Sequence, residues 1–154
     1  MSNISIEDVK KLREQTAAGI ADCRKALEEA KGDFTKAEEL LRSWGIAKAA
    51  SKADRAVGAG LVDTYIHANG KVGAMVEVNC ETDFVARTDE FKNLCHELAM
   101  QVAAMDPRDV KDLLGQDYIR NAGTTVETIV KETIAKIGEN IVIKRFMRFE
   151  LGSD

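Results

Sequence analysis

The sequence contains few of the residues that build metal sites or disulfide frameworks. Its 154 residues include three widely separated cysteines and two histidines, His67 and His96. No Cys-x-x-Cys pair occurs, and neither histidine stands at the spacing of a zinc ligand. We therefore expect no metal site, and three buried thiols in a protein that works in a reducing compartment.

Long apolar runs are also absent. No window approaches the roughly 18 consecutive apolar residues of a membrane-spanning helix. The N-terminal run Met-Ser-Asn-Ile-Ser-Ile-Glu-Asp lacks the basic and apolar regions of a signal peptide. Hydrophobic residues make up 45% and charged residues 31%, as in a globular protein. We expect a cytoplasmic protein that makes no contact with a membrane.

A basic surplus is missing as well. The net charge is −4, whereas nucleic-acid-binding domains usually carry a positive patch. The nearest candidates, Lys48, Lys52 and Arg55, recur at roughly helical spacing and are better explained as the solvated face of a connecting helix. Direct nucleic-acid binding is therefore disfavoured, and a small RNA- or DNA-associated factor that uses these cations is only an alternative.

The sequence lacks the motifs of common active sites. It has no Gly-x-x-x-x-Gly-Lys-Ser/Thr loop for nucleotide phosphates and no Gly-x-Ser-x-Gly nucleophile elbow. The cluster Gly58-Ala59-Gly60 precedes a strand-like run instead of following one, which is the wrong context for dinucleotide binding. We expect a protein that is not an enzyme, with no catalytic residues and no cofactor.

The first part of the chain carries helical patterning. Within residues 1–45, Ser5, Asp22 and Thr35 each stand where a side chain can cap a short amphipathic helix. Three helices of this length enclose little core, so we expect a small docking module that depends on a partner. Residues 46–58, rich in alanine and charge, suit a helical linker.

Residues 59–154 show the pattern of an α+β domain. Two strand-like runs flank Asn69-Gly70, a strong hairpin signal. Two amphipathic helices follow, one ending before Pro107 and one capped by Thr124. The expected elements are strands at 61–67, 71–79 and 141–151, helices at 91–105 and 126–137, and a weakly helical stretch at 109–123. We expect a small antiparallel three-stranded sheet packed with helices.

The last strand decides which residues line each face of this sheet. Strict alternation predicts a single apolar row consisting of Ile141, Ile143, Met147, Phe149 and Leu151. Tyr65, Met75 and Phe146 would then lie on the second face. So small a sheet needs a cover, and dimerisation through a sheet or helix face would supply one. We therefore expect a homodimer.

The junction at residues 80–87 carries an aromatic residue where a short polar loop is usual. On one interpretation, Thr82 caps a turn, Asp83 favours its N-terminus and Phe84 tucks into the core. On the other, Phe84 is an exposed side chain that enters a pocket on a partner, because such aromatic residues can dominate an interface. We predict that Phe84 is partly exposed in the free protein; full burial would count against the second interpretation.

Four parts of the sequence resemble segments of the elongation factor Ts family. The most specific is Asn-Cys-Glu-Thr-Asp-Phe-Val-Ala-Arg at residues 79–87. The others lie in the family's order and are Val9–Leu27, Ala47–Asp54, and Ala135–Ile141 with Arg145–Phe149. The first of them is similar to a ubiquitin-associated (UBA) three-helix domain. The resemblance therefore implies a UBA-like docking module at 1–45, a linker, and a core and dimerisation domain at 59–154.

The resemblance implies a guanine-nucleotide exchange factor for elongation factor Tu. In this family a Thr-Asp-Phe-Val segment, here Thr82, Asp83, Phe84 and Val85, pushes into the nucleotide-binding domain of elongation factor Tu near its bound magnesium. The implied secondary contacts are Arg13, Gly19, Ile20, Ile137 and Gly138. The factor would bind elongation factor Tu both with GDP and without nucleotide.

The sequence departs from the family's usual pattern in three respects. Where the family usually has Gly-Ala-Gly and two methionines, this chain has Ala17-Ala18-Gly19-Ile20-Ala21, which reduces the apolar docking contact. The stretch between Pro107 and Thr124 is abbreviated. The chain has one copy of a core subdomain that long members carry twice, and short members pair up as homodimers. The alternative function is a UBA-like adaptor without exchange activity, in which residues 1–45 bind a protein alone.

Overall fold

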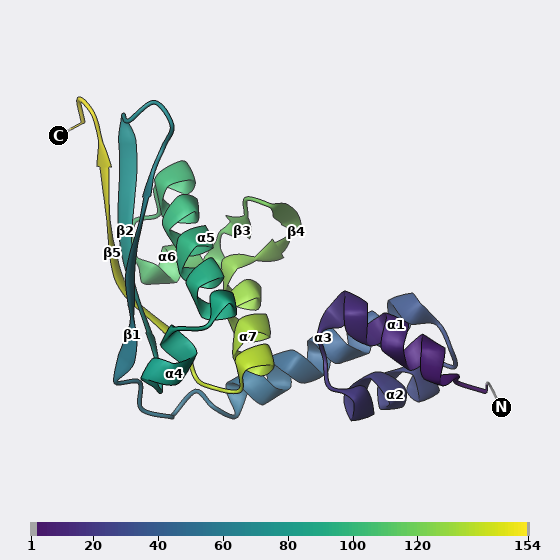
Figure 1. Ribbon diagram of the computed structural model, residues 1–154. Coiled ribbons are helices and arrows are strands. Elements are labelled where there is room, and N and C mark those ends of the chain that lie inside the picture. Colours follow the sequence, from purple (N-terminus) through teal and green to yellow (C-terminus); the bar gives the residue numbers. More distant parts are fainter. Residues whose placement is uncertain (1–2, 154) are drawn as a thin grey trace. The chain divides into compact units, whose positions relative to one another are not determined.

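Three helices occupy the first part of the chain in the computed structural model, which describes residues 3–153 (Figure 1). They are α1 (Ile6–Thr16), α2 (Ile20–Glu29) and α3 (Phe34–Ala50). Their common core is small, and its buried members are Val9, Leu12, Cys23, Ala26, Leu27, Ala30, Ala37 and Leu41. Internal contacts divide the chain into a first and a second unit between Lys48 and Ala49, and α3 continues from one into the other.

The starts of these helices test the predicted caps. Ser5 caps α1 as predicted, because its hydroxyl accepts a first-turn backbone N–H at 3.0 Å. The caps predicted at Asp22 and Thr35 are wrong, because α2 begins after Gly19 and α3 begins after Asp33. The Asp33 carboxylate accepts a first-turn N–H at 3.2 Å. Both misplaced residues lie in a first turn, where small polar side chains are also favourable and pattern alone does not separate the positions.

A three-stranded antiparallel sheet forms one layer of the second unit, and helices cover one of its faces (Figure 1). The strands are β1 (Ala59–Ile66), β2 (Val72–Cys80) and β5 (Val142–Glu150), in the spatial order β1-β2-β5. The turn between β1 and β2 is tight: Gly70 has φ 70°, and its N–H donates to the His67 carbonyl at 2.8 Å. The predicted hairpin and the α+β fold are confirmed.

Two long helices pack on this sheet and share its core. They are α5 (Asp89–Met105), which ends just before Pro107 as predicted, and α7 (Val126–Ile137). The largest fully buried apolar side chains of this core are Phe91, Leu113, Val76, Val78, Val102 and Val126. Thr125, not the predicted Thr124, caps α7, because its hydroxyl accepts a first-turn N–H at 3.2 Å. The two neighbouring threonines are indistinguishable as caps by residue type alone.

The stretch at 109–123 is only partly helical. It contains α6 (Val110–Gly115) and continues as a small hairpin of β3 (Asp117–Tyr118) and β4 (Asn121–Thr125). The buried side chain of Gln101 in α5 donates to the Asp117 carbonyl and accepts the Ile119 N–H, both at 3.0 Å. These bonds to a distant side chain replace the local bonds of a helix, so the periodicity of the sequence does not reveal the hairpin.

A β-bulge lies in the last strand. Glu77 pairs with Arg145, whereas the next residue, Val78, pairs with Ile143. Lys144 is therefore an extra residue in β5, and the inward and outward alternation is inverted after it. A bulge of this kind has no signal in a pattern of apolar residues.

This inversion corrects the predicted faces of the sheet. The prediction of one continuous apolar row is wrong. Its members Ile141 and Ile143 are buried, whereas Met147, Phe149 and Leu151 are exposed. Phe146 and Tyr65, predicted for the second face, pack against the core instead. For Tyr65 the reason is the hairpin register, which pairs it with the buried Ala74.

Candidate functional site

Phe84 has the highest fractional exposure of any large hydrophobic side chain in the described part of the chain. It is 81% exposed, while its neighbours Val85 and Ala86 are buried. These residues belong to α4 (Asp83–Ala86), a single helical turn between β2 and α5. The prediction that Phe84 is exposed is confirmed, and the interpretation that it tucks into the core is wrong. The turn therefore presents the Phe84 ring to solvent, while Val85 and Ala86 on its other side pack against the core.

Thr82 and Asp83 define the start of this turn. The Thr82 hydroxyl caps α4 by accepting the Val85 N–H at 3.3 Å, and the exposed Asp83 carboxylate lies in the first turn. The buried Cys80 thiol donates to the Thr82 carbonyl at 3.3 Å. Burial, assisted by the Glu139 carboxylate, raises the pKa of Cys80, so the thiol keeps the proton that it donates at neutral pH.

The turn that follows α7 lies against the Phe84 turn. Gly138 ends α7 with φ 83°, a left-handed conformation that favours glycine, and its N–H donates to the Ile134 carbonyl at 2.8 Å. Immediately after it, the Glu139 carboxylate accepts the Thr82 N–H at 3.0 Å. The structure thus brings the Thr-Asp-Phe-Val segment next to the turn predicted as a second contact, at Ile137 and Gly138.

Four residues join these turns through contacts that the sequence did not predict, although the resemblance already implied the turn at 136–140 as a second contact. They are Arg55, Glu81, Glu139 and Asn140. One signal existed: the runs at 79–87 and 135–141 both resemble the same family, although they are far apart in the chain. The hydrogen bonds between the two runs have no counterpart in a local pattern.

The predicted docking patch of the first unit surrounds the loop between α1 and α2. Arg13, Gly19 and Ile20 are all exposed, and 59% of the Ile20 surface is accessible. Ala17 in this loop has φ 55°, in the left-handed region that favours glycine. The resemblance accounts for this conformation, because the family usually has glycine at that position. The start of α2 therefore presents the exposed apolar side chain of Ile20.

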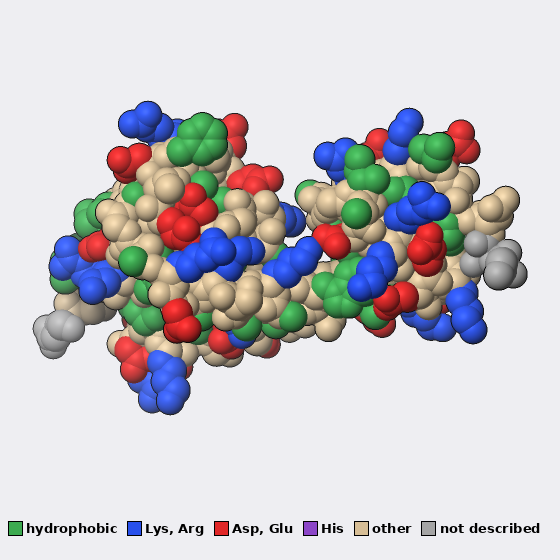
Figure 2. Space-filling view, turned by 90° about the horizontal axis from the view of Figure 1, so that it is seen from below, with side chains coloured by type: hydrophobic (Ala, Val, Ile, Leu, Met, Phe, Trp, Pro, Cys, Tyr) green, Lys and Arg blue, Asp and Glu red, His purple; other side chains and the backbone are tan. Residues whose placement is uncertain are grey.

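The three cations considered for nucleic acid do not form one helical face. Lys48 lies in α3 and its Nζ is 2.6 Å from the Asp22 carboxylate. Lys52 and Arg55 follow the end of α3, and Arg55 Nη1 is 3.6 Å from the Glu81 carboxylate. On the face of the molecule shown in Figure 2, Lys and Arg side chains lie among Asp and Glu side chains. The predicted continuous helical face is wrong because the helix ends first.

An apolar surface covers the open face of the three-stranded sheet. Its exposed members, which we call the open-face patch, are Val62, Ile66, Met75, Met147, Phe149 and Leu151. The strand register pairs Met75 with Met147. It also flanks Gly73 with Ile66 on one side and Phe149 on the other. Ile66, Met75, Met147, Phe149 and Leu151 line one hollow and are therefore contiguous, whereas Val62 lies at the margin, opposite Glu77. A contiguous exposed apolar patch marks an interaction surface.

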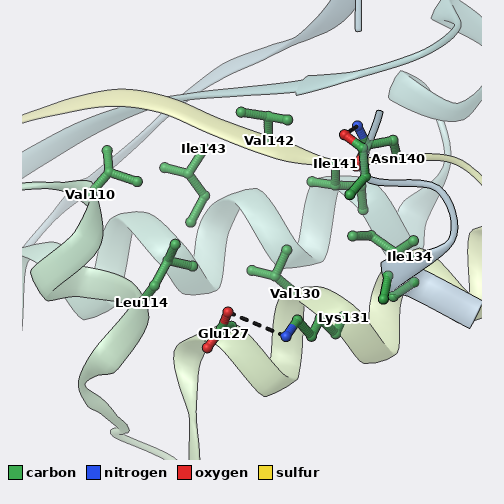
Figure 3. Close-up of a pocket in the computed structure, with 13 residues that line it drawn as sticks. Val110, Leu114, Glu127, Val130, Lys131, Ile134, Asn140, Ile141, Val142 and Ile143 are labelled. Carbon is green, nitrogen blue, oxygen red and sulfur yellow. Dashed lines mark hydrogen bonds and ion pairs between the residues drawn. The ribbon is translucent and has the colours of Figure 1, made fainter. Parts of the chain in front are cut away.

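A pocket of about 290 Å³ opens between α6, α7 and β5 (Figure 3). Its walls are mainly aliphatic, with Val130 and Ile134 among them, and its polar groups are already engaged. Glu127 and Lys131 pair with each other at 3.3 Å, and the Asn140 amide donates to two backbone carbonyls. The lining contains no cysteine, histidine, serine or threonine, and its lysine and glutamate are paired with each other.

The described part of the chain contains no metal-ligand cluster, and its thiols are buried. Residues 3–153 contain no group of three or more His, Cys, Asp or Glu side chains that could hold a metal ion. The three cysteines are buried, as predicted. Burial raises the pKa of Cys95 to about 12, so this thiol stays protonated at neutral pH. Within the same range, none of the helices has the length and apolarity needed to cross a bilayer.

Comparison with known proteins points to one family. The model of the family described as Elongation factor TS matches residues 81–154. Elongation factor Ts of Thermoanaerobacter sp. (strain X514) is 46% identical over 194 aligned residues, which cover 97% of this chain and 95% of that protein. Elongation factor Ts of Nostoc sp. (strain PCC 7120 / SAG 25.82 / UTEX 2576) is 52% identical over 151 residues, which cover 98% of this chain and 48% of that protein.

The two relatives differ from this chain in length. The first alignment extends over 194 residues although this chain has 154, so that relative contains additional residues inside the aligned region. The second relative is about twice as long as the part that this chain matches. The chain thus corresponds to nearly the whole of one relative and to about half of the other.

Proposed function

This chain belongs to the elongation factor Ts family and is a translation elongation factor, and we propose that it promotes the release of GDP from elongation factor Tu. Phe84 carries this proposal, because an apolar ring that is 81% exposed on a fastened turn is suited to enter a pocket on a partner. The activity makes and breaks no covalent bond, and the factor is not an enzyme in that sense.

Phe84 acts as a wedge in this mechanism, with the Asp83 carboxylate as its polar neighbour. The ring enters the nucleotide-binding domain of elongation factor Tu and displaces elements that hold the magnesium ion of that protein. Since a magnesium ion at that site would help to hold the diphosphate, disturbing the elements that hold it would weaken the binding of GDP. The coupling is reciprocal, so bound nucleotide also weakens the affinity of elongation factor Tu for the factor. The factor binds both the GDP-bound and the nucleotide-free form of elongation factor Tu.

The other proposed contacts dock the factor on elongation factor Tu. Arg13, Gly19 and Ile20 form the docking patch of the UBA-like module, and all three are exposed. Ile137 and Gly138 form a second contact in the turn that adjoins Thr82. Ile20 supplies the apolar contact for which the family usually uses methionine.

Two copies of the chain pair through the open-face patch in the proposed assembly. A contiguous apolar face on a small sheet supports this pairing. The length of the Nostoc relative supports it too, because that protein is about twice as long as the part that this chain matches. Each copy would bind one molecule of elongation factor Tu in the cytoplasm, without direct contact with nucleic acid or membrane.

Release of a fluorescent GDP analogue from elongation factor Tu tests the exchange function. The wild-type chain should accelerate release, and Phe84→Ala should lower the maximal rate at least about tenfold, as expected for a central interface residue. Since Phe84 is exposed in the free protein, this substitution should leave the free energy of unfolding within about 0.5 kcal/mol of wild type.

Met105→Ala is the matched control, because Met105 is also an exposed apolar residue but lies at the end of α5. This variant should retain full activity. A wild-type chain that leaves GDP release unchanged would refute the exchange function. Full activity in Phe84→Ala would refute the wedge and leave the exchange function standing.

A further inference from the structure

We propose that Glu139 is a positioning residue for nucleotide exchange, whose carboxylate fixes the turn that carries Phe84. The inference rests on the proposed exchange function and adds to it the device that holds the wedge. Glu139 and Glu81 lie in two turns that are far apart in the sequence, and each carboxylate binds the backbone of the opposite turn. We call Glu81, Thr82, Glu139 and Asn140 the glutamate clasp.

Glu139 makes three hydrogen bonds to the turn that precedes Phe84. Its Oε1 accepts the N–H of Glu81 at 3.2 Å and the N–H of Thr82 at 3.0 Å. Its Oε2 accepts the Thr82 hydroxyl at 2.8 Å. A carboxylate forms hydrogen bonds about twice as strong as those of a neutral acceptor. These two N–H groups precede the first turn of α4, where no helical carbonyl is available to accept them.

The bond to the Thr82 hydroxyl also determines how α4 begins. A hydroxyl has one proton to donate and two lone pairs that can accept. Because the proton points to Glu139, a lone pair remains for the Val85 N–H at 3.3 Å. Phe84 lies between these two residues in the chain. The carboxylate therefore acts on the orientation of Phe84 through Thr82, without touching the ring.

Glu81 fastens the turn of Glu139 in return. Its Oε1 accepts the Asn140 N–H at 2.9 Å and lies 3.6 Å from Arg55 Nη1. The Asn140 side chain is buried, and its amide donates to the carbonyls of Ala53 at 3.2 Å and Arg55 at 2.9 Å. The clasp is thus tied to a third segment of the second unit, so Glu139 is itself held in place.

The Phe84 turn needs this external support. A helix of four residues is too short to be stable alone. Phe84 contributes little burial, so apart from the clasp the turn is held mainly by the buried Val85 and Ala86 and by the Cys80 thiol. A loosened turn would have to be ordered when Phe84 enters the docked partner during GDP release, at a cost in free energy. The clasp removes that cost from the release step by holding Phe84 in position beforehand.

Two conservative variants separate positioning from charge. Glu139→Gln removes the charge but keeps an oxygen that can accept the two N–H groups and an amide that can donate to the Thr82 hydroxyl. Glu139→Asp keeps the charge, but its side chain is one methylene shorter and cannot reach all three partners. If Glu139 positions the turn, glutamine should preserve exchange better than aspartate. A direct effect of the negative charge on the partner would produce the opposite order.

The measurement is the rate of GDP-analogue release over a range of factor concentrations, combined with amide hydrogen exchange of the free factor. For Glu139→Asp we expect a maximal rate about tenfold lower, the factor that corresponds to one lost charge-assisted hydrogen bond. The half-saturating concentration should change little. The N–H groups of Thr82 and Val85 should exchange faster. Glu139→Gln should stay within about threefold of wild type, as neutral hydrogen bonds replace charged ones.

Glu127→Gln is the matched control, since it makes the same charge change at a half-exposed ion pair in α7 and should leave both readouts unchanged. Equal activity of wild type and Glu139→Asp would overturn the inference alone. A glutamine variant less active than the aspartate variant would overturn it in favour of a direct charge effect. A wild-type chain without any effect on GDP release would overturn the exchange function itself, and with it this role of Glu139.

Discussion

At the scale of single residues, Gly60 shows how closely two backbones approach beside the Phe84 turn. Gly60 lies in β1 opposite Asn79, near the end of β2. Its φ is 148°, and a Cβ added to it would lie 2.2 Å from the Val78 carbonyl oxygen. An alanine at this position therefore forces either the backbone of β1 or that of β2 to move.

Gly60→Ala should lower the free energy of unfolding of the second unit by about 2 kcal/mol or more, because the clash is with backbone and the φ value is unfavourable for alanine. Urea unfolding measures the change. Gly58→Ala is the control: a Cβ there has no heavy-atom neighbour within 4 Å, so its effect should stay within about 0.5 kcal/mol. Equal unfolding midpoints for the two variants would contradict the close approach seen at Gly60.

Residue types predicted some of the site, and spatial contacts decided the rest. The exposure of Phe84 could be predicted because an aromatic residue beside Asp83 is out of place in a short junction between two core elements. The bond between Glu139 and Thr82 could not be predicted, because the two residues are 57 positions apart in the sequence. A hydrogen bond over that distance leaves no local sequence pattern, and a glutamate is an ordinary residue for such a turn.

At the scale of elements, Glu97 joins α5 to the small β3–β4 hairpin. Its carboxylate accepts the Tyr118 hydroxyl at 2.8 Å and pairs with the Arg120 guanidinium. Burial alone would raise the pKa of Glu97, but the hydrogen bonds from Arg120 and Tyr118 outweigh burial and lower it. Burial and the Glu97 carboxylate together raise the pKa of Tyr118 to about 12. The folded state therefore favours an ionised Glu97 beside a neutral Tyr118.

Glu97→Gln should lower the free energy of unfolding at pH 7 by about 1–2 kcal/mol, the range for a lost hydrogen bond to a charged group when its cation is half-exposed. A carboxyl whose pKa is lowered by folding contributes stability that is fully present above its unfolded pKa of about 4.3 and is lost as the pH falls from there through its lower folded-state pKa. The difference between wild type and Glu97→Gln should therefore shrink on acidification. Urea unfolding at pH 7, 5 and 3 measures it.

The control is again Glu127→Gln, because the half-exposed pair with Lys131 should contribute little at any pH. If Glu97→Gln and wild type differed equally at pH 7 and pH 3, the ionised form of Glu97 would not be the source of the stability.

The main elements could be predicted because their periodicity matches their burial. The alternation of β2 and the apolar stripe of α5 correspond to the buried faces in the structure. The β3–β4 hairpin could not be predicted, because its backbone groups bond to the buried Gln101 side chain. The bulge at Lys144 was equally invisible, since one extra residue changes the outward face of β5 without changing its composition.

At the scale of the whole molecule, the ordered resemblance over nearly the full chain was more informative than any single pattern. It predicted both the family and the segment that contains Phe84, and the relatives show the same family. The expectation of a second apolar face was correct for Met75 and wrong for Tyr65 and Phe146. The hairpin register places Tyr65 against the core, and the bulge turns Phe146 inward and Met147 outward. The surface available for pairing is therefore the open-face patch.

Met147→Lys tests the proposed pairing at the centre of this patch. Sedimentation should give the wild-type chain twice the 16.9 kDa of one copy, and the variant the mass of one copy. The reason is that a lysine beside Met75 would bury an unpaired charge in the apolar interface. Met147 is exposed in the single chain, so the variant should still fold.

The control is Met105→Lys, at an exposed position outside the patch, which should remain a dimer. A wild-type chain that sediments as a single copy at micromolar concentration would refute the pairing, whereas a variant that remains a dimer would place the interface elsewhere.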